Sequence, residues 1–415
     1  MLYDMFEAQH KMLGPWRIAA EAARGWFGHP LSPLAYMPIA RRITASSDLF
    51  LRITQRYQKP AWNIDSTAID GKPVAVEEVT ELDKPFCRLV HFRRALEVKS
   101  GAKRNDPRVL LVAPLSGHHA TLLRDTVRSL LPDHEVWVTD WVDARMVPLS
   151  AGPFHLADYI DYVREFITLL TESRNSNLNV ISVCQPTVPV LCAVALMAQD
   201  KIPNPPKTMV MMGGPIDARK SPTAVNNLAT QKPYSWFEQN VIQRVPDKYP
   251  GYMRRVYPGF LQHLGFVAMN PDRHMNAHWD YFNHLLHGEG DPAEKHRDFY
   301  DEYNAVLDLP AEYYLDTIKS VFQDFALPKG RMFVRDQLVR PQAIHDTALL
   351  TIEGELDDIS GNGQTEAAHL LCLSIPREKR EHFVAPGAGH YGIFAGRRWR
   401  DTIYPKVRDF IRKHA

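Results

Sequence analysis

The chain has 415 residues, a formal net charge of +1 at neutral pH, 45% hydrophobic residues and 23% charged residues. These proportions are typical of a globular protein that buries a sizeable core, and the near-neutral charge gives no reason to expect a nucleic-acid partner. The four cysteines (Cys87, Cys184, Cys192 and Cys372) show neither CxxC pairing nor zinc spacing, which favours reduced thiols in a cytoplasm over a disulfide framework. No stretch reaches the roughly 18 apolar residues of a membrane span, and the charged N-terminus does not resemble a signal peptide.

The first 70 residues predict a helical segment. Apolar side chains recur at helical spacing from Leu2 to Leu13, and less regularly over 39–53. Such an amphipathic start can dock on the core of the protein or on an apolar surface, and the sequence leaves both open. Residues 72–98 alternate loosely and predict two strands that open a sheet, and residues 100–107 predict a polar, basic turn.

Strands and helices then alternate through residue 214, which predicts the first part of an α/β core. Strands are predicted over 108–114, 135–141, 178–183 and 208–214, with helices over 120–131, 156–170 and 191–198. From 215 to 340 the alternation stops, and 19 of the 42 Trp, Tyr and Phe residues lie between positions 216 and 345. This stretch predicts an inserted, mainly helical, aromatic-rich cap. The core resumes over 341–415, with strands over 347–354 and 381–384 and helices over 365–373 and 399–413.

A cysteine stands at the turn between the 178–183 strand and the helix that follows. A sharp turn between a strand and a helix projects its apex side chain out of the sheet, and the helix start supplies backbone N–H groups. The apex is Cys184, and Ser182 and Pro186 occupy the positions where glycines usually permit the close approach of strand and helix. Serine is small, and proline suits the first helical turn. Taken alone, this stretch fits a nucleophile and a buried structural cysteine equally well.

Two further polar residues follow the ends of late strands. Asp357 comes three residues after Gly354, and His390 lies in a glycine-rich loop after the last strand. Sites in open α/β sheets lie outside the carboxyl ends of the strands, and the order nucleophile, acid, histidine is that of the α/β-hydrolases. Cys184, His390 and Asp357 are therefore predicted as nucleophile, general base and orienting acid, with Asp358 as the rival acid.

The loop after the 108–114 strand is expected to complete this site. Backbone N–H groups of Gln185 and of Leu115 or Ser116 are predicted to stabilise an oxyanion. His118 and His119 either line the cleft or pack and cap at the start of the next helix.

Two other patterns carry less weight. The four histidines between 274 and 287 lack the glutamate of an HExxH motif, so no metal site is expected. A GxGxxG match begins at Gly387, but it follows the last strand and leaves no room for a dinucleotide site.

Four motifs in this order carry a family resemblance: Val183–Thr187, Pro114–His119, Gly354–Ile359 and Gly387–His390. Together they resemble the intracellular polyhydroxyalkanoate (poly-3-hydroxybutyrate) depolymerases of bacteria, over nearly the whole chain. The resemblance implies a cysteine-type α/β-hydrolase in the cytoplasm that acts on amorphous polyester at storage granules, with its triad at positions 184, 357 and 390. It implies no bound cofactor, with water or coenzyme A as the acyl acceptor.

Three alternatives stay open. Polyhydroxyalkanoate synthases are similar acyltransferases, but their elbow reads Gly-x-Cys-x-Gly, which Ser182 and Pro186 do not match. The other two are a granule-associated protein that kept the fold without the reaction, and a hydrolase of small esters. Oligomeric state, chain-length preference and endo or exo cleavage do not follow from the sequence.

Overall fold

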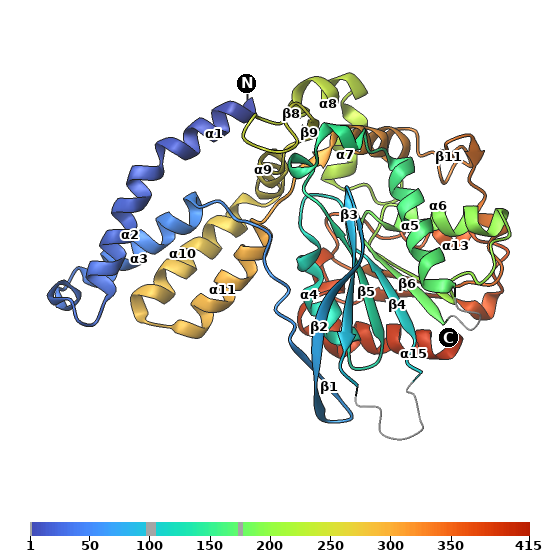
Figure 1. Ribbon diagram of the computed structural model, residues 1–415, viewed down its shortest axis with the longest axis horizontal. Coiled ribbons are helices and arrows are strands. Elements are labelled where there is room, and N and C mark those ends of the chain that lie inside the picture. The colour runs from blue at the N-terminus through green and yellow to red at the C-terminus, as the bar shows by residue number, and fades with distance from the viewer. Residues whose placement is uncertain (1, 97–104, 173–176) are drawn as a thin grey trace.

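A nine-stranded sheet forms the centre of the computed structural model, which describes residues 2–96, 105–172 and 177–415 (Figure 1). Its strand order is β1-β2-β3-β5-β4-β6-β7-β13-β14. Strands from β1 to β5 pair antiparallel, and those from β5 to β14 pair parallel. The strands are β1 (Ser66–Ile69), β2 (Lys72–Lys84), β3 (Cys87–Arg94), β4 (Arg108–Val112), β5 (Glu135–Trp141), β6 (Leu178–Val183), β7 (Thr208–Met212), β13 (Ala348–Gly354) and β14 (Arg380–Ala385).

Helices connect the parallel strands and cover the sheet. They are α4 (Arg124–Leu130), α5 (Leu156–Thr171), α6 (Thr187–Gln199) and, after β14, α15 (Tyr404–His414). α4 and α15 contact each other, and so do α5 and α6. The chain reverses its direction across the sheet at β5, so right-handed crossovers place these two pairs on opposite faces. With the long insertion between β7 and β13, this is the predicted α/β-hydrolase fold.

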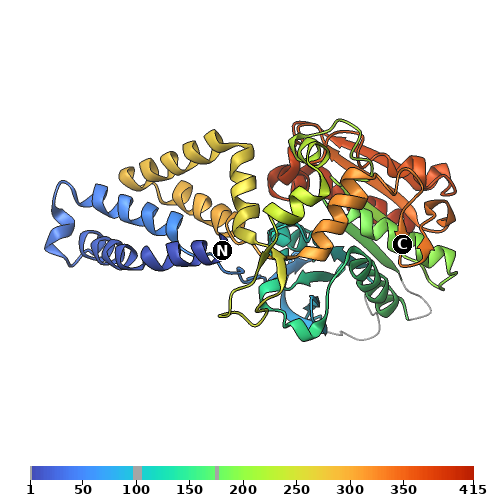
Figure 2. The ribbon, with the colours of Figure 1, turned by 90° about the horizontal axis from the view of Figure 1, so that it is seen from above.

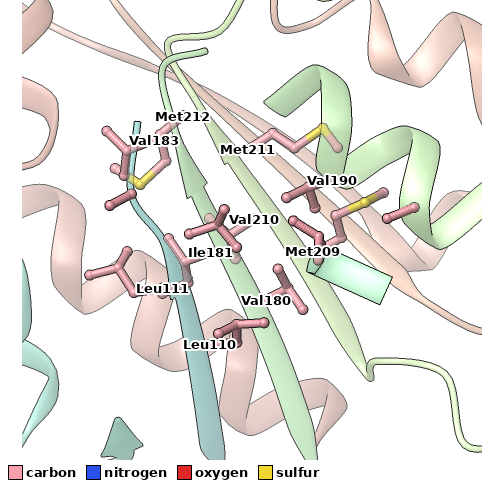
Figure 3. Packing of buried hydrophobic residues seen from close by; sticks show 14 of the residues in the cluster. Leu110, Leu111, Val180, Ile181, Val183, Val190, Met209, Val210, Met211 and Met212 are labelled. Carbon is pink, nitrogen blue, oxygen red and sulfur yellow. The ribbon is translucent and has the colours of Figure 1, made fainter. Parts of the chain in front are cut away.

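Successive side chains of the central strands point to opposite faces of the sheet, so each strand contributes to the core on both faces. Ile181 pairs with Leu111 on β4 and with Val210 on β7, so these three side chains share one face. Val180 and Met209 share the opposite face, where α6 packs (Figure 3). All six residues of β6 are buried, which explains why a largely apolar run marks this strand in the sequence.

The N-terminal helices form an arm instead of docking on the sheet. α1 (Leu2–Met12), α2 (Gly14–Gly28) and α3 (Ala40–Thr54) project from the α/β core beside α10 (Pro271–His287) and α11 (Gly290–Tyr303) of the insertion (Figures 1 and 2). α3 packs against both α2 and α10. The residues predicted as one cap therefore divide, with α10 and α11 in the arm.

The rest of the insertion stays with the core, where α12 packs against α5. Its elements are α7 (Ala224–Gln231), α8 (Tyr234–Asn240), β8 (Gln243–Arg244), β9 (Arg255–Tyr257), α9 (Gly259–Met269), β10 (Leu309–Pro310), α12 (Ala311–Thr317), β11 (Phe333–Val334) and β12 (Gln337–Leu338). No helix in the described ranges is both long enough and apolar enough to cross a membrane.

Some predicted elements differ in extent. The segment predicted as helical over 1–70 ends as helix at residue 54, and residues 66–69 pair with β2 as an edge strand. The helix predicted over 365–373 shrinks to α13 (Ala368–Leu371), because the buried Glu353 carboxylate accepts the preceding backbone N–H groups, including that of Thr365, in a series of turns. The closing helix begins earlier, at α14 (Gly396–Arg398), and contains a π-helical turn before Pro405. The predicted turn at 100–107 lies mostly outside the described residues.

Candidate active site

Cys184 occupies the turn between β6 and α6 in a left-handed backbone conformation, with φ of 69°. This conformation costs a non-glycine residue roughly 1–2 kcal/mol, so neighbouring structure must hold it. The backbone N–H of Cys184 donates to the carbonyl oxygen of Met212 on β7 at 2.7 Å. The side chain is partly exposed at the carboxyl end of the sheet. A strained apex of this kind is the geometry of a nucleophile elbow.

Two glycines after β7 let the chain pass close to this turn. A Cβ atom on Gly213 would lie 3.3 Å from Asp357 Oδ2 and 3.3 Å from His390 Cε1, and φ there is +57°. A Cβ atom on Gly214 would lie 2.4 Å from the carbonyl oxygen of Cys184. The sequence places this pair at the rim of the site but does not reveal that both positions require glycine.

Asp357 and His390 meet at the ends of β13 and β14. His390 Nδ1 lies 2.8 Å from Asp357 Oδ2, and their side chains are 5% and 0% exposed. The other carboxylate oxygen, Oδ1, accepts the backbone N–H groups of Ile359 at 2.9 Å and Ser360 at 2.8 Å. Asp358, the rival acid, is exposed. The fixed carboxylate of Asp357 orients the imidazole of His390.

The electrostatic surroundings of His390 favour its charged form. Burial alone would lower the pKa of this imidazole, but the charges of Cys184 and Asp357, and hydrogen bonds to both, raise the pKa well above its ordinary value. The structure therefore brings all three predicted triad side chains together, with the imidazole between carboxylate and thiol.

Three aromatic side chains fix the loop after β4. The carbonyl oxygen of Ala113 accepts Trp141 Nε1–H at 2.8 Å and the hydroxyl of Tyr159 at 3.2 Å. The carbonyl oxygen of Leu115 accepts the hydroxyl of Tyr313, on α12, at 2.9 Å. Sequence reasoning missed these tyrosines, because no local pattern ties them to a loop 46 or 198 residues away.

The backbone N–H groups that are predicted as oxyanion donors are not used in hydrogen bonds within the described part of the protein. Within the described residues, no protein acceptor pairs with the backbone N–H of Gln185, Leu115 or Ser116. The next glycine, Gly117, has its carbonyl oxygen bonded to the N–H of Leu307 at 2.8 Å. A planar peptide directs its N–H opposite to its C=O. The hydrogen bond to the carbonyl oxygen of Leu115 therefore also sets the direction of the N–H of Ser116, in the same peptide.

His118 and His119 differ in their surroundings. His118 Nε2 lies 3.1 Å from the carbonyl oxygen of Tyr303, and its ring stacks on Phe266 at 4.9 Å. Burial lowers the pKa of His118 to about 4 and that of His119 to about 3, so both are neutral at physiological pH. His119 lines the cavity between the arm and the core, and His118 does not.

That cavity has a volume of about 1130 Å³ and lies between the arm and the core. Its walls come from α1, the end of α3, the loop after β5 and α9, with Leu13, Trp141 and Phe260 among the apolar lining residues. None of the three triad residues lines it. Among the described residues, no group of three or more His, Cys, Asp or Glu is arranged to hold a metal ion.

Comparison with curated proteins gives no match to this chain. Similar solved structures include a 2-hydroxy-6-oxo-6-phenylhexa-2,4-dienoate hydrolase from Rhodococcus sp. strain RHA1, with 11% identity, a TM-score of 0.45 and coverage of 81% of this chain and 100% of that one. A soluble variant of monoglyceride lipase from Saccharomyces cerevisiae has 12% identity and a TM-score of 0.45, covering 87% and 98%. A thermophilic esterase from Thermogutta terrifontis has 14% identity and a TM-score of 0.41, covering 85% and 98%.

A family model described as "PHB de-polymerase C-terminus" matches residues 213–415. The match includes Asp357 and His390, while Cys184 precedes it. It agrees with the resemblance that the four sequence motifs carry. Residues 213–415 of this chain are therefore similar to the PHB depolymerase C-terminal family.

Proposed function

We propose that this protein is a cytoplasmic, granule-associated ester hydrolase that degrades amorphous poly(3-hydroxybutyrate) through Cys184, His390 and Asp357. The observation that carries the proposal is the meeting of thiol, imidazole and carboxylate from three separate strand ends. They meet in a chain whose residues 213–415 match the PHB depolymerase C-terminal family model.

The first half-reaction begins with proton transfer from Cys184 to His390. His390 uses Nδ1 to donate to Asp357, so Nε2 is left to accept the thiol proton, and the raised pKa of His390 favours this transfer. The thiolate attacks an ester carbonyl carbon and forms a C–S bond. The N–H groups of Gln185 and of Leu115 or Ser116 stabilise the oxyanion, each by about 3 kcal/mol.

Collapse of the tetrahedral intermediate breaks the C–O bond of the ester. His390 returns the proton to the departing alkoxide, which leaves as the hydroxyl end of the polymer, and a 3-hydroxyacyl thioester stays on Cys184. A water molecule then gives a proton to His390 and attacks the thioester. The products are a free thiol and 3-hydroxybutyrate or a short oligomer. If coenzyme A replaces water, the same thioester yields an acyl-coenzyme A.

The test is mass analysis of the products from amorphous poly(3-hydroxybutyrate), with and without coenzyme A. The wild-type protein is expected to release 3-hydroxybutyrate or oligomers, and Cys184→Ala to release none. Cys192→Ala is the matched control, because this second thiol is fully buried in α6 and takes no part in the reaction. Acyl-coenzyme A among the products would identify thiolysis.

Other outcomes would select the alternatives. Equal polymer loss with wild type and Cys184→Ala would point to a protein without a catalytic thiol. Polymer formation from 3-hydroxybutyryl-coenzyme A would identify an acyltransferase of the synthase type. Cleavage of short soluble esters without any cleavage of the polymer would identify a small-ester hydrolase.

A further inference from the structure

α2 is a helix without a buried side chain. None of its 15 residues is buried, although it carries two tryptophans and a phenylalanine. A helix of this length is marginal in water unless a packed face stabilises it, and α2 packs mainly against α3, with smaller contacts to α1 and to residues 33–36. Its outer side is therefore a surface that is suited to a further partner.

The exposed apolar side chains continue beyond α2 to the far end of the arm. Trp16 and Trp26 are 69% and 65% exposed, and Leu31 and Tyr36 in the connection to α3 are 87% and 79% exposed. This connection, residues 29–39, lies at the end of the arm in both views (Figures 1 and 2). Exposed apolar side chains gathered in this way mark an interaction site. We refer to residues 14–42 as the docking face.

The polar groups of the docking face are almost all hydrogen-bond donors. It contains four arginines, of which Arg24 pairs with Asp48 on α3 at 3.0 Å, against a single carboxylate, Glu21, and the two indole N–H groups add further donors. Arg41 and Arg42 are exposed at the start of α3. A second copy of the same face would bring these like charges together, which costs free energy. A polyester offers apolar methylene and methyl groups and ester oxygens that only accept, and so complements this composition.

The arm that carries the docking face also forms a wall of the cavity. Leu13, which directly precedes α2, and Ile53 near the end of α3 both line it. At about 1130 Å³ this cavity exceeds the roughly 300–1,000 Å³ typical of sites for small ligands. The cavity therefore lies at the base of the arm, next to the start of the docking face.

We propose that the docking face holds the protein on the surface of an amorphous poly(3-hydroxybutyrate) particle. This inference rests on the proposed function for the identity of the polymer, but it concerns adsorption and not cleavage. Tryptophan and leucine side chains enter the outer layer of the polymer, and the arginines donate to ester carbonyls at its boundary.

The experiment measures adsorption of the full-length Cys184→Ala protein to amorphous poly(3-hydroxybutyrate) particles by sedimentation, so that no substrate is consumed. Adding Trp16→Gln, Trp26→Gln and Leu31→Gln is expected to weaken adsorption by roughly tenfold or more, since each substitution removes a large apolar contact. The matched control adds Leu370→Gln and Leu373→Gln, which are 63% and 62% exposed outside the arm, and should adsorb normally. In the active enzyme the three arm substitutions should raise KM for particles and leave kcat/KM for a short soluble ester unchanged.

Unchanged adsorption of the triple variant, or an equal loss in the control, would overturn the inference. So would tighter binding to phosphatidylglycerol vesicles than to polyester particles, which would make a lipid surface the partner. A wild-type dimer that the triple variant converts to a monomer, measured by light scattering, would show that a second copy covers the face. Arm-dependent adsorption without hydrolysis by the wild-type protein would refute the proposed function but support the inference about the docking face.

Discussion

Replacing Asp357 by asparagine tests the triad most sharply, because it changes one oxygen into a donor. Oδ1 can keep its bonds to the N–H groups of Ile359 and Ser360, and the new NH2 group then faces His390 Nδ1. A flipped amide would leave two buried N–H groups without acceptors, at about 1–3 kcal/mol each. The unflipped form is therefore favoured, and it forces Nδ1 to accept and Nε2 to carry the proton. An imidazole in this tautomer cannot take the proton of Cys184.

The expected loss in kcat is between about 10² and 10⁴, or roughly 3–5 kcal/mol of transition-state stabilisation. The assay is release of 3-hydroxybutyrate from amorphous particles, together with hydrolysis of a short soluble ester. Asp358→Asn is the matched control, because this neighbouring carboxylate is exposed, and we expect it to stay within twofold of wild type. A loss below tenfold for Asp357→Asn, or equal losses for both variants, would refute the reasoning.

Three further predictions concern the supports of the site. Gly214→Ala should lower the free energy of unfolding by about 3 kcal/mol or more and abolish activity, because its Cβ would lie 1.8 Å from Thr187 Oγ1; thermal unfolding measures this. Tyr313→Phe should lower kcat roughly tenfold with little change in KM for a soluble ester, since the buried carbonyl oxygen of Leu115 loses its donor. Burial, together with the nearby carboxylate of Asp308, raises the pKa of Asp143 above its ordinary value, so the folded state holds this proton more tightly than the unfolded chain. The free energy of unfolding should therefore fall as the pH rises from 4 to 7, and urea titrations should show a flatter profile for Asp143→Asn.

Each of these variants has a control in the chain. Gly290→Ala adds a Cβ that meets nothing within 4 Å, so a comparable loss there would contradict the steric explanation for Gly214. Tyr252→Phe removes a hydroxyl from an exposed tyrosine and should leave kcat unchanged. Equal pH profiles for the wild-type protein and Asp143→Asn would contradict the burial argument.

The residues of the candidate site could be predicted because they stand in short motifs at strand ends. The apolar run before Cys184 gives the bounds of β6, and the residues that follow β13 and β14 supply Asp357 and His390. The contacts that hold the site in place could not be predicted in this way. Tyr313 on α12 donates a hydrogen bond to the loop after β4. Glu353 accepts backbone N–H groups 10 to 13 residues ahead. Such contacts depend on tertiary packing and leave no periodic pattern in the sequence.

The arm shows the same limit on a larger scale. The sequence predicts helices in the N-terminal segment and in the insertion, which contain α3 and α10 more than 200 residues apart. No pattern in either segment indicates that the two helices are partners. Their contact arises because both helices are amphipathic and neither covers the sheet. The alternatives stated for the N-terminus, docking on the core or on an apolar surface, do not include the packing of α3 on α10 of the insertion.

The insertion between β7 and β13 has a consequence for the order of synthesis. Cys184 is made before the insertion, whereas Asp357 and His390 are made after it, on the strands that complete the sheet. A growing chain on the ribosome thus carries its thiol while about two hundred more residues are added, before His390 has been made. The proposed triad can therefore assemble only after the final strands have joined the sheet.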